Sequence, residues 1–129
     1  MECQDQREES EGRWFLDYEN LANKDVTNDC IWNNGFSYAF RKVYECGQYY
    51  IVQISATSNA FVNGAIIVTL PKNVACSQYM TGLIVASSGV PTGAVCVAMT
   101  SQGVKTVTVN ISGAALNGYI VLSLLIPKQ

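Results

Sequence analysis

The chain has 129 residues, of which 49% are hydrophobic and 14% charged, with a net charge of −2 and no histidine. This length supports one domain with its own core, while the charged fraction is well below the roughly 25% of an average soluble protein. The charge is uneven, because residues 1–35 hold nine of the ten acids and residues 36–129 hold five scattered bases, which excludes the clustered lysine and arginine of a nucleic-acid-binding surface.

Neither a secretory signal nor a membrane span is visible in the sequence. Met1 is followed by acidic and polar residues instead of a basic and then an apolar run. The most apolar stretch, Tyr119–Ile126, has eight residues, whereas a helix that crosses a membrane needs about 20. We therefore expect that the protein does not insert into a membrane. We expect it to be assembled in the cytoplasm.

Residues 1–35 predict an irregular, acidic N-terminal arm that serves as an attachment or linker segment. Its first residues are almost wholly polar, and Glu19–Asn34 is rich in asparagine and aspartate, which favours loops. Within that stretch, Ile31 and Trp32 are candidate anchors onto the rest of the protein. The folded body is predicted to span residues 36–129.

The body predicts a series of short strands separated by turn residues. Phe36, Tyr38 and Phe40 alternate with small or polar residues, and this period of two is typical of a strand. Tyr50, Val52, Ile54 and Ala56 are predicted to share one face of the next strand. The remaining predicted strands are Ala65–Leu70, Tyr79–Ser87, Gly93–Thr100, Val104–Ile111 and Tyr119–Ile126. About seven or eight such strands predict an all-β fold, an antiparallel β-sandwich of jelly-roll type.

Two of these strands are apolar on both faces, which suggests self-association. In an antiparallel strand with one solvent-exposed face, apolar and polar residues alternate, as they do in Val104–Ile111. They do not alternate in Ala65–Val68 or in Tyr119–Ile126. The outer apolar face of these strands can be covered by a loop or the N-terminal arm of the same chain, or by a second subunit. We favour the second subunit. The candidate self-association residues are Tyr119, Val121, Leu125, Ile66 and Val68.

The body lacks the side chains that most enzymes use. After Glu45 the chain contains no aspartate, glutamate or histidine, so no general acid–base pair, no base beside a nucleophile and no carboxylate cage is available. The five cysteines have no paired spacing, and we expect structural thiols such as Cys96 in place of a zinc site or a disulfide framework. We therefore expect no enzymatic activity, no metal and no cofactor.

Aromatic side chains on strands are the candidate ligand-binding residues. Tyr49, Tyr79 and Trp32 are each placed where the ring can face outward and stack on a sugar ring, although packing across strands is a commoner role for such rings. The candidate binding loops, grouped at one end of the sandwich, are Thr57–Gly64, Ser87–Gly93 and Ser112–Gly118.

Four segments of the body carry a resemblance to a known family. Arg41-Lys42-Val43, Tyr50–Ser55, Val68–Pro71 and Gly118–Ile126 follow one another in an order that resembles the C-terminal head domains of bacteriophage tail-fibre and baseplate structural proteins. These heads are β-sandwiches similar to tumour-necrosis-factor and complement-globular domains. The resemblance covers about residues 36–129, and it implies a trimer that recognises host-surface saccharides.

The arm departs from that family, because only some 35 residues precede the body, without heptads or Gly-X-Y repeats. The chain is then either a fragment or attached through its arm to a larger phage structural protein. We expect a non-enzymatic virion component, a trimeric receptor-binding head. The alternative is a capsid decoration or head-fibre protein that is attached through its arm and binds no receptor.

Overall fold

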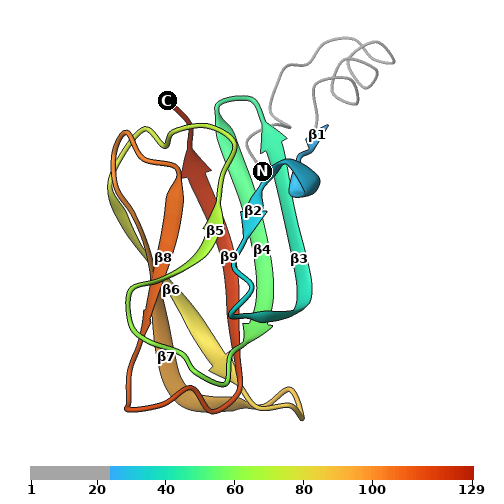
Figure 1. Cartoon of the computed structure of the whole chain (residues 1–129), viewed down its shortest axis with the longest axis vertical. Helices are drawn as coiled ribbons and strands as arrows, with labels where there is room; N and C mark the ends of the chain where they lie inside the picture. The colour runs from blue at the N-terminus through green and yellow to red at the C-terminus, as the bar shows by residue number, and fades with distance from the viewer. Residues whose placement is uncertain (1–23) are drawn as a thin grey trace, which may run out of the picture.

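The computed structural model describes residues 24–129, which are almost entirely β-structure (Figure 1). Two short strands, β1 (Lys24–Asp25) and β2 (Ile31–Trp32), flank a 3-10 turn, η2 (Thr27–Asp29). The longer strands are β3 (Ser37–Cys46), β4 (Tyr49–Thr57), β5 (Ala65–Thr69), β6 (Gln78–Val85), β7 (Pro91–Thr100), β8 (Thr106–Ile111) and β9 (Tyr119–Pro127). The all-β prediction is confirmed. Among the described residues, no helix has the length and apolar character needed to cross a membrane.

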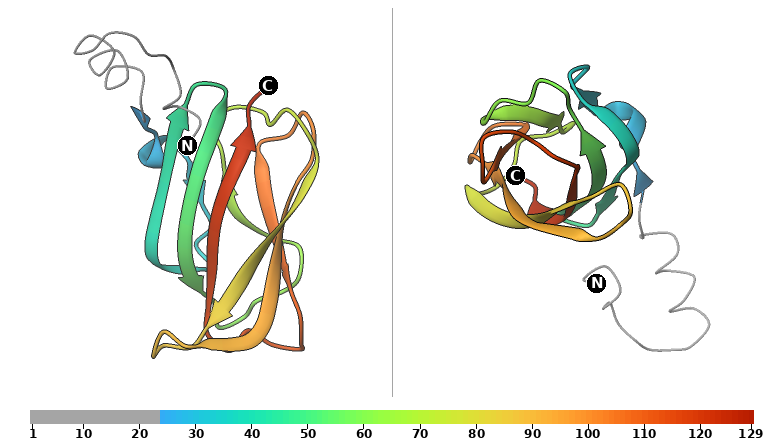
Figure 2. Two further views of the ribbon diagram at one scale, coloured as in Figure 1. Left: turned by 180° about the vertical axis from the view of Figure 1, so that it is seen from behind. Right: turned by 90° about the horizontal axis from the view of Figure 1, so that it is seen from below.

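The nine strands form one antiparallel sheet in the order β1-β3-β4-β9-β6-β7-β8-β5-β2. The end-on view in Figure 2 shows that this sheet curls around on itself, which gives the sandwich-like shape. Buried side chains form the core inside the curled sheet. The curl brings the two edges of the sheet towards each other, so that β2 and β5 lie near the first half of β3.

The core is made by the inward-facing half of each strand. On β4, Tyr50, Val52, Ile54 and Ala56 are all buried, as the period of two predicts. The other long strands contribute in the same way, with buried positions that include Val107, Val109, Ile111, Ile120, Leu122, Leu124 and Ile126. Full burial of an aliphatic or aromatic side chain of this size contributes about 1.5–3 kcal/mol.

Two β-bulges change the alternation that the sequence predicts. The pairing of β3 with β4 shifts between Tyr38 and Phe40, so Phe40 turns to the outside and is 49% exposed. The pairing of β5 with β8 shifts between Ile66 and Val68, and Ile67 and Val68 are both fully buried. The prediction that Val68 belongs to a self-association surface is therefore wrong, because its own chain already covers it.

Side chains close the gap between the two edges of the sheet. The Thr27 hydroxyl accepts a hydrogen bond from the Val43 amide at 2.9 Å and donates one to the Val43 carbonyl at 3.4 Å. The Tyr38 hydroxyl donates to the Ile67 carbonyl at 2.7 Å and accepts from the Asn33 amide at 3.2 Å. These bonds help to satisfy backbone groups near the two edges of the sheet, together with the bond from the Val26 amide to the Val43 carbonyl at 2.9 Å.

Residues 24–32 help to close the gap between the two edges of the sheet, whereas the sequence predicts an irregular arm up to residue 35. Trp32 pairs with β5 through its backbone, and its indole N–H donates to the Thr27 carbonyl at 3.0 Å. The Arg41 guanidinium lies 4.9 Å from the centroid of the Trp32 ring. The folded domain therefore begins by Lys24, and the rest of the predicted arm, residues 1–23, lies outside the described residues.

Candidate functional site

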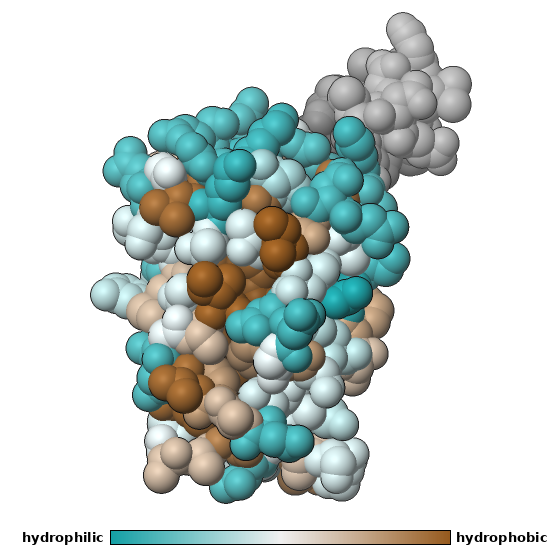
Figure 3. All heavy atoms as spheres, viewed as in Figure 1, coloured by the Kyte–Doolittle hydropathy of each residue, from teal (hydrophilic) through white to brown (hydrophobic). Residues whose placement is uncertain are grey.

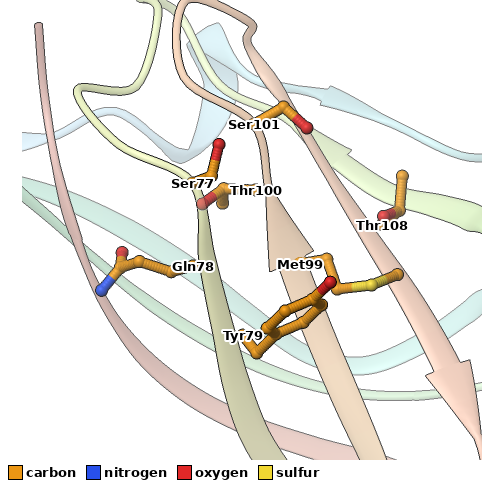
Figure 4. Close-up of a pocket in the computed structure, with 7 residues that line it drawn as sticks. All are labelled: Ser77, Gln78, Tyr79, Met99, Thr100, Ser101 and Thr108. Carbon is orange, nitrogen blue, oxygen red and sulfur yellow. The ribbon is translucent and has the colours of Figure 1, made fainter.

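A shallow groove lies on the outer face of β6, β7 and β8 (Figure 4). The strand register sets Tyr79 opposite Met99 and Met99 opposite Thr108, so three outward side chains stand side by side on three strands. The groove has a volume of about 420 Å³. Its lining residues are Ser77, Gln78, Tyr79, Met99, Thr100, Ser101 and Thr108. We call it the Tyr79 groove.

The Tyr79 side chain is the dominant feature of this groove. It is 82% exposed, and in Figure 4 its ring extends across β7 beside Met99. A tyrosine ring combines an apolar face with a hydroxyl that donates or accepts hydrogen bonds. Gln78 precedes it on β6 and points to the other side of the sheet (Figure 4), so the amide group of Gln78 does not contribute to the outer surface of the groove.

Residues with hydroxyl groups line the groove, and of these Thr100 is buried on the inner face of the sheet opposite Gln78. The Ser77 hydroxyl accepts a hydrogen bond from the Gln102 amide at 3.0 Å, which fixes its position and leaves its O–H to donate elsewhere. The Thr100 hydroxyl donates to the Cys76 carbonyl at 3.0 Å and holds the end of β7 against the segment before β6. None of the lining residues is charged. The groove therefore suits a neutral ligand with both an apolar face and hydrogen-bonding groups.

The three aromatic residues predicted as ligand-binding residues are on three different strands and do not converge. Trp32 is half-buried, and the Arg41 guanidinium lies over its ring. Trp32 lines a separate shallow groove of about 200 Å³ between β2 and β5. Tyr49 begins β4, opposite Cys46 and Pro127, and does not line the Tyr79 groove. Of the three, Tyr79 is the one that lines the Tyr79 groove.

The predicted binding loops connect β4 to β5, β6 to β7 and β8 to β9, so all three lie at the same end of the sheet (Figure 1). A second groove of about 350 Å³ lies between the latter two loops, with Thr92, Ser112 and Asn117 among its lining residues. Tyr79 is at the start of β6, towards the opposite end. The Tyr79 groove is thus separate from the loops that sequence reasoning selected.

A mostly apolar row of side chains crosses the outer face of five neighbouring strands. The register places Phe40 beside Ser55, Ser55 beside Val121, Val121 beside Leu83 and Leu83 beside Val95. Phe40 and Leu83 are each 49% exposed and Val95 is 42% exposed. Ser55 places a hydroxyl between Phe40 and Val121 in this outer row, and the row contains no charged side chain.

The remaining candidate self-association residues face outward. Tyr119 lies half-buried beside the outer row on β9, and Leu125 is exposed further along the same strand. Ile66 is exposed on β5 and lines the small groove with Ile31, which is 68% exposed on β2. Figure 3 shows apolar surface gathered over these two strands. We call this second surface the β2–β5 patch.

Glu45, the carboxylate of the predicted body, is held by lysines. Its carboxylate pairs with the ammonium group of Lys128, and Lys72 lies 3.7 Å away. The hydrogen bond from Lys128 lowers the pKa of Glu45 below its ordinary value. A carboxylate that stays ionised between two lysines is poorly suited to general acid–base catalysis near neutral pH.

Among the described cysteines, Cys30 and Cys96 are buried in the core, Cys76 is a half-buried free thiol and Cys46 is cross-linked. Burial raises the pKa of Cys30 to about 12 and that of Cys96 to about 11, so both stay protonated at neutral pH. Cys46 is disulfide-bonded, which the prediction of structural thiols did not include. Within residues 24–129, no three or more cysteine, aspartate or glutamate side chains gather as a metal site would require.

Comparison with known proteins gives no relative for this chain, since no family model, no curated protein and no solved structure matches it.

Proposed function

We propose that the protein is a non-enzymatic bacteriophage virion component, a trimeric fibre head that recognises host-surface saccharides. The outer row is the observation that carries this proposal. Three half-exposed apolar side chains, Phe40, Leu83 and Val95, are aligned with Val121 on four strands, and Ser55 of β4 lies between Phe40 and Val121. An exposed and mostly apolar surface of this kind is typical of a protein–protein interface.

The β2–β5 patch supports a cyclic assembly. In a ring, each contact is head-to-tail, so every copy needs two different surfaces. The outer row runs from β3 to β7, whereas the β2–β5 patch lies on the strands at the other edge of the sheet. A single self-complementary surface would have favoured a dimer instead.

The solution mass tests the trimer. Light scattering across a concentration series should give a mass near three times 14.0 kDa. Leu83→Glu places a charge in the outer row and should give monomers, because burying an unpaired carboxylate at an interface is costly. Val90→Glu, at an exposed loop tip outside both surfaces, is the matched control and should remain trimeric.

A mixing experiment tests the head-to-tail contact. Leu83→Glu blocks the outer row and Ile66→Glu blocks the β2–β5 patch, so each variant alone should be monomeric. An equal mixture should form heterodimers, because one intact pair of surfaces remains. A wild-type chain that stays monomeric at every concentration overturns the trimer. A trimer that binds no saccharide in a glycan screen would instead favour the capsid-decoration alternative.

A further inference from the structure

We infer that the Tyr79 groove is the saccharide site and that it selects neutral sugars over acidic ones. This inference rests on the proposed function, since it names the site and the ligand class through which such a head would act. It places the ligand on the outer faces of β6, β7 and β8 and not on the three loops at the far end.

The exposed ring is the first step in this argument. A side chain as large as tyrosine gains stability by burying its ring, and yet Tyr79 leaves 82% of its surface in water. Leu83 lies four residues further along β6 on the same face and is only 49% exposed. The apolar face of a pyranose ring, with its axial C–H groups, can cover such an aromatic surface while its hydroxyls stay hydrated.

The hydroxyl groups around the ring are the second step. Ser77 and Ser101 lie at one end of the groove and Thr108 lies on its far strand (Figure 4). Each hydroxyl offers one donor and two acceptor positions, which matches the donors and acceptors that a sugar hydroxyl presents. Because the Gln102 amide already holds Ser77, that group is fixed in place before a ligand arrives.

The lack of charged side chains in the groove indicates which class of sugar it binds. An acidic sugar brings a carboxylate, which is bound well only where a cation or several amide donors face it. The groove is lined by residues with hydroxyls, a thioether and a phenol ring, and by Gln78, whose amide points away from the outer face, and by no lysine or arginine. A neutral hexose or N-acetylhexosamine needs no such partner, so the lining favours it.

The groove also fits weak binding that is strengthened by assembly. Its volume of about 420 Å³ is near the lower end of the range of about 300–1,000 Å³ that is usual for ligand sites, and it is open on one side. A single copy should therefore bind weakly. In a trimer, three grooves that contact one surface would raise the apparent affinity through effective concentration.

A glycan array of the full-length chain tests the inference. The probes are matched oligosaccharides that end in galactose, glucose, mannose or N-acetylglucosamine, together with the sialylated form of each galactose-ended probe. We expect binding to neutral probes and at least about tenfold weaker binding to their sialylated partners. Tyr79→Ala should weaken binding to neutral probes by about tenfold or more, whereas Tyr79→Phe, which keeps the ring, should stay within about threefold.

Tyr49→Ala is the matched control, because Tyr49 is an outward tyrosine that does not line the groove. It should bind as the wild type does. Stronger binding to the sialylated probes overturns the neutral class, and unchanged binding by Tyr79→Ala overturns the site, while the proposed head function stands in both cases. A wild-type chain that binds no glycan overturns the proposed saccharide recognition itself, and the inference with it.

Discussion

Replacing Gly82 with alanine should destabilise the fold, although alanine is an ordinary residue in a β-strand. Gly82 is buried on the inner face of β6, opposite Cys96. A Cβ atom added there would lie 2.5 Å from Cδ2 of Leu122, 2.6 Å from the Val121 carbonyl oxygen and 2.8 Å from the Cys96 sulfur. Real Cβ atoms do not approach other heavy atoms this closely, so the neighbours have to move.

The size of the effect follows from which neighbours can move. The Leu122 methyl can rotate away, but the Val121 carbonyl belongs to the backbone of β9 and cannot shift without disturbing its ladder. Overpacking a core costs about 1–3 kcal/mol, and removing a glycine from a strand returns about 0.5–1 kcal/mol. Because the Val121 carbonyl cannot move easily, we take the upper part of the overpacking range. We therefore expect the free energy of unfolding to fall by about 2 kcal/mol.

Urea denaturation and thermal melting, followed by circular dichroism at one fixed protein concentration, measure this loss. The melting temperature should fall by about 8 °C. Thr81→Ala, on the outer face of the same strand, is the matched control and should change stability by less than about 0.5 kcal/mol. A loss of less than about 0.5 kcal/mol for Gly82→Ala would refute the close approach of β6 and β9.

Three further substitutions test the charged cluster and the closure of the sheet. Glu45→Gln should cost about 2 kcal/mol at neutral pH, since it removes the charged hydrogen bond from Lys128. Because the pKa of Glu45 is lowered in the folded protein, its contribution is present above the ordinary value of 4.5 and is lost as the pH falls below it. Urea midpoints measured from about pH 7 down to pH 3 should therefore fall less steeply for this variant, and parallel curves would contradict the ion pair. Thr27→Val should cost about 1–3 kcal/mol, because the Val43 amide loses its hydrogen bond to the Thr27 hydroxyl, whereas the Val43 carbonyl keeps its bond from the Val26 amide. Thr27→Ser, which keeps the hydroxyl, should recover most of this loss, and equal losses for the two variants would count against the proposed bonds. Tyr38→Phe should cost about 1 kcal/mol and speed hydrogen exchange of the backbone amides near the closure, and unchanged exchange would argue against it.

The sequence predicted the strands where burial follows a strict period of two. Val107, Val109 and Ile111 alternate with threonine and asparagine, and the structure buries those three residues. Phe40 was misplaced because a β-bulge adds one residue to the spacing, and no local residue marks it. The same reason accounts for Val68, since the adjacent burial of Ile67 and Val68 reads in sequence as a strand that is apolar on both faces.

The candidate site was only partly predictable. Tyr79 was selected as an aromatic residue on an outer face, and that position is where the structure leaves it exposed. Met99 and Thr108 were missed because they are 20 and 29 positions away in the sequence. Only the register of β6, β7 and β8 brings them beside Tyr79, and register depends on pairings that single-sequence patterns do not determine.

The short edge strands and the side chains that cap them have a consequence for how copies of this chain can meet. An open strand edge recruits any chain that offers a matching backbone, which leads to aggregates without a fixed number of subunits. Here Thr27 and Tyr38 occupy backbone groups at the edges with side-chain hydroxyls. Association through side-chain surfaces is then favoured over strand addition. Such contacts depend on shape and chemistry, so a single substitution can weaken them without unfolding the subunit.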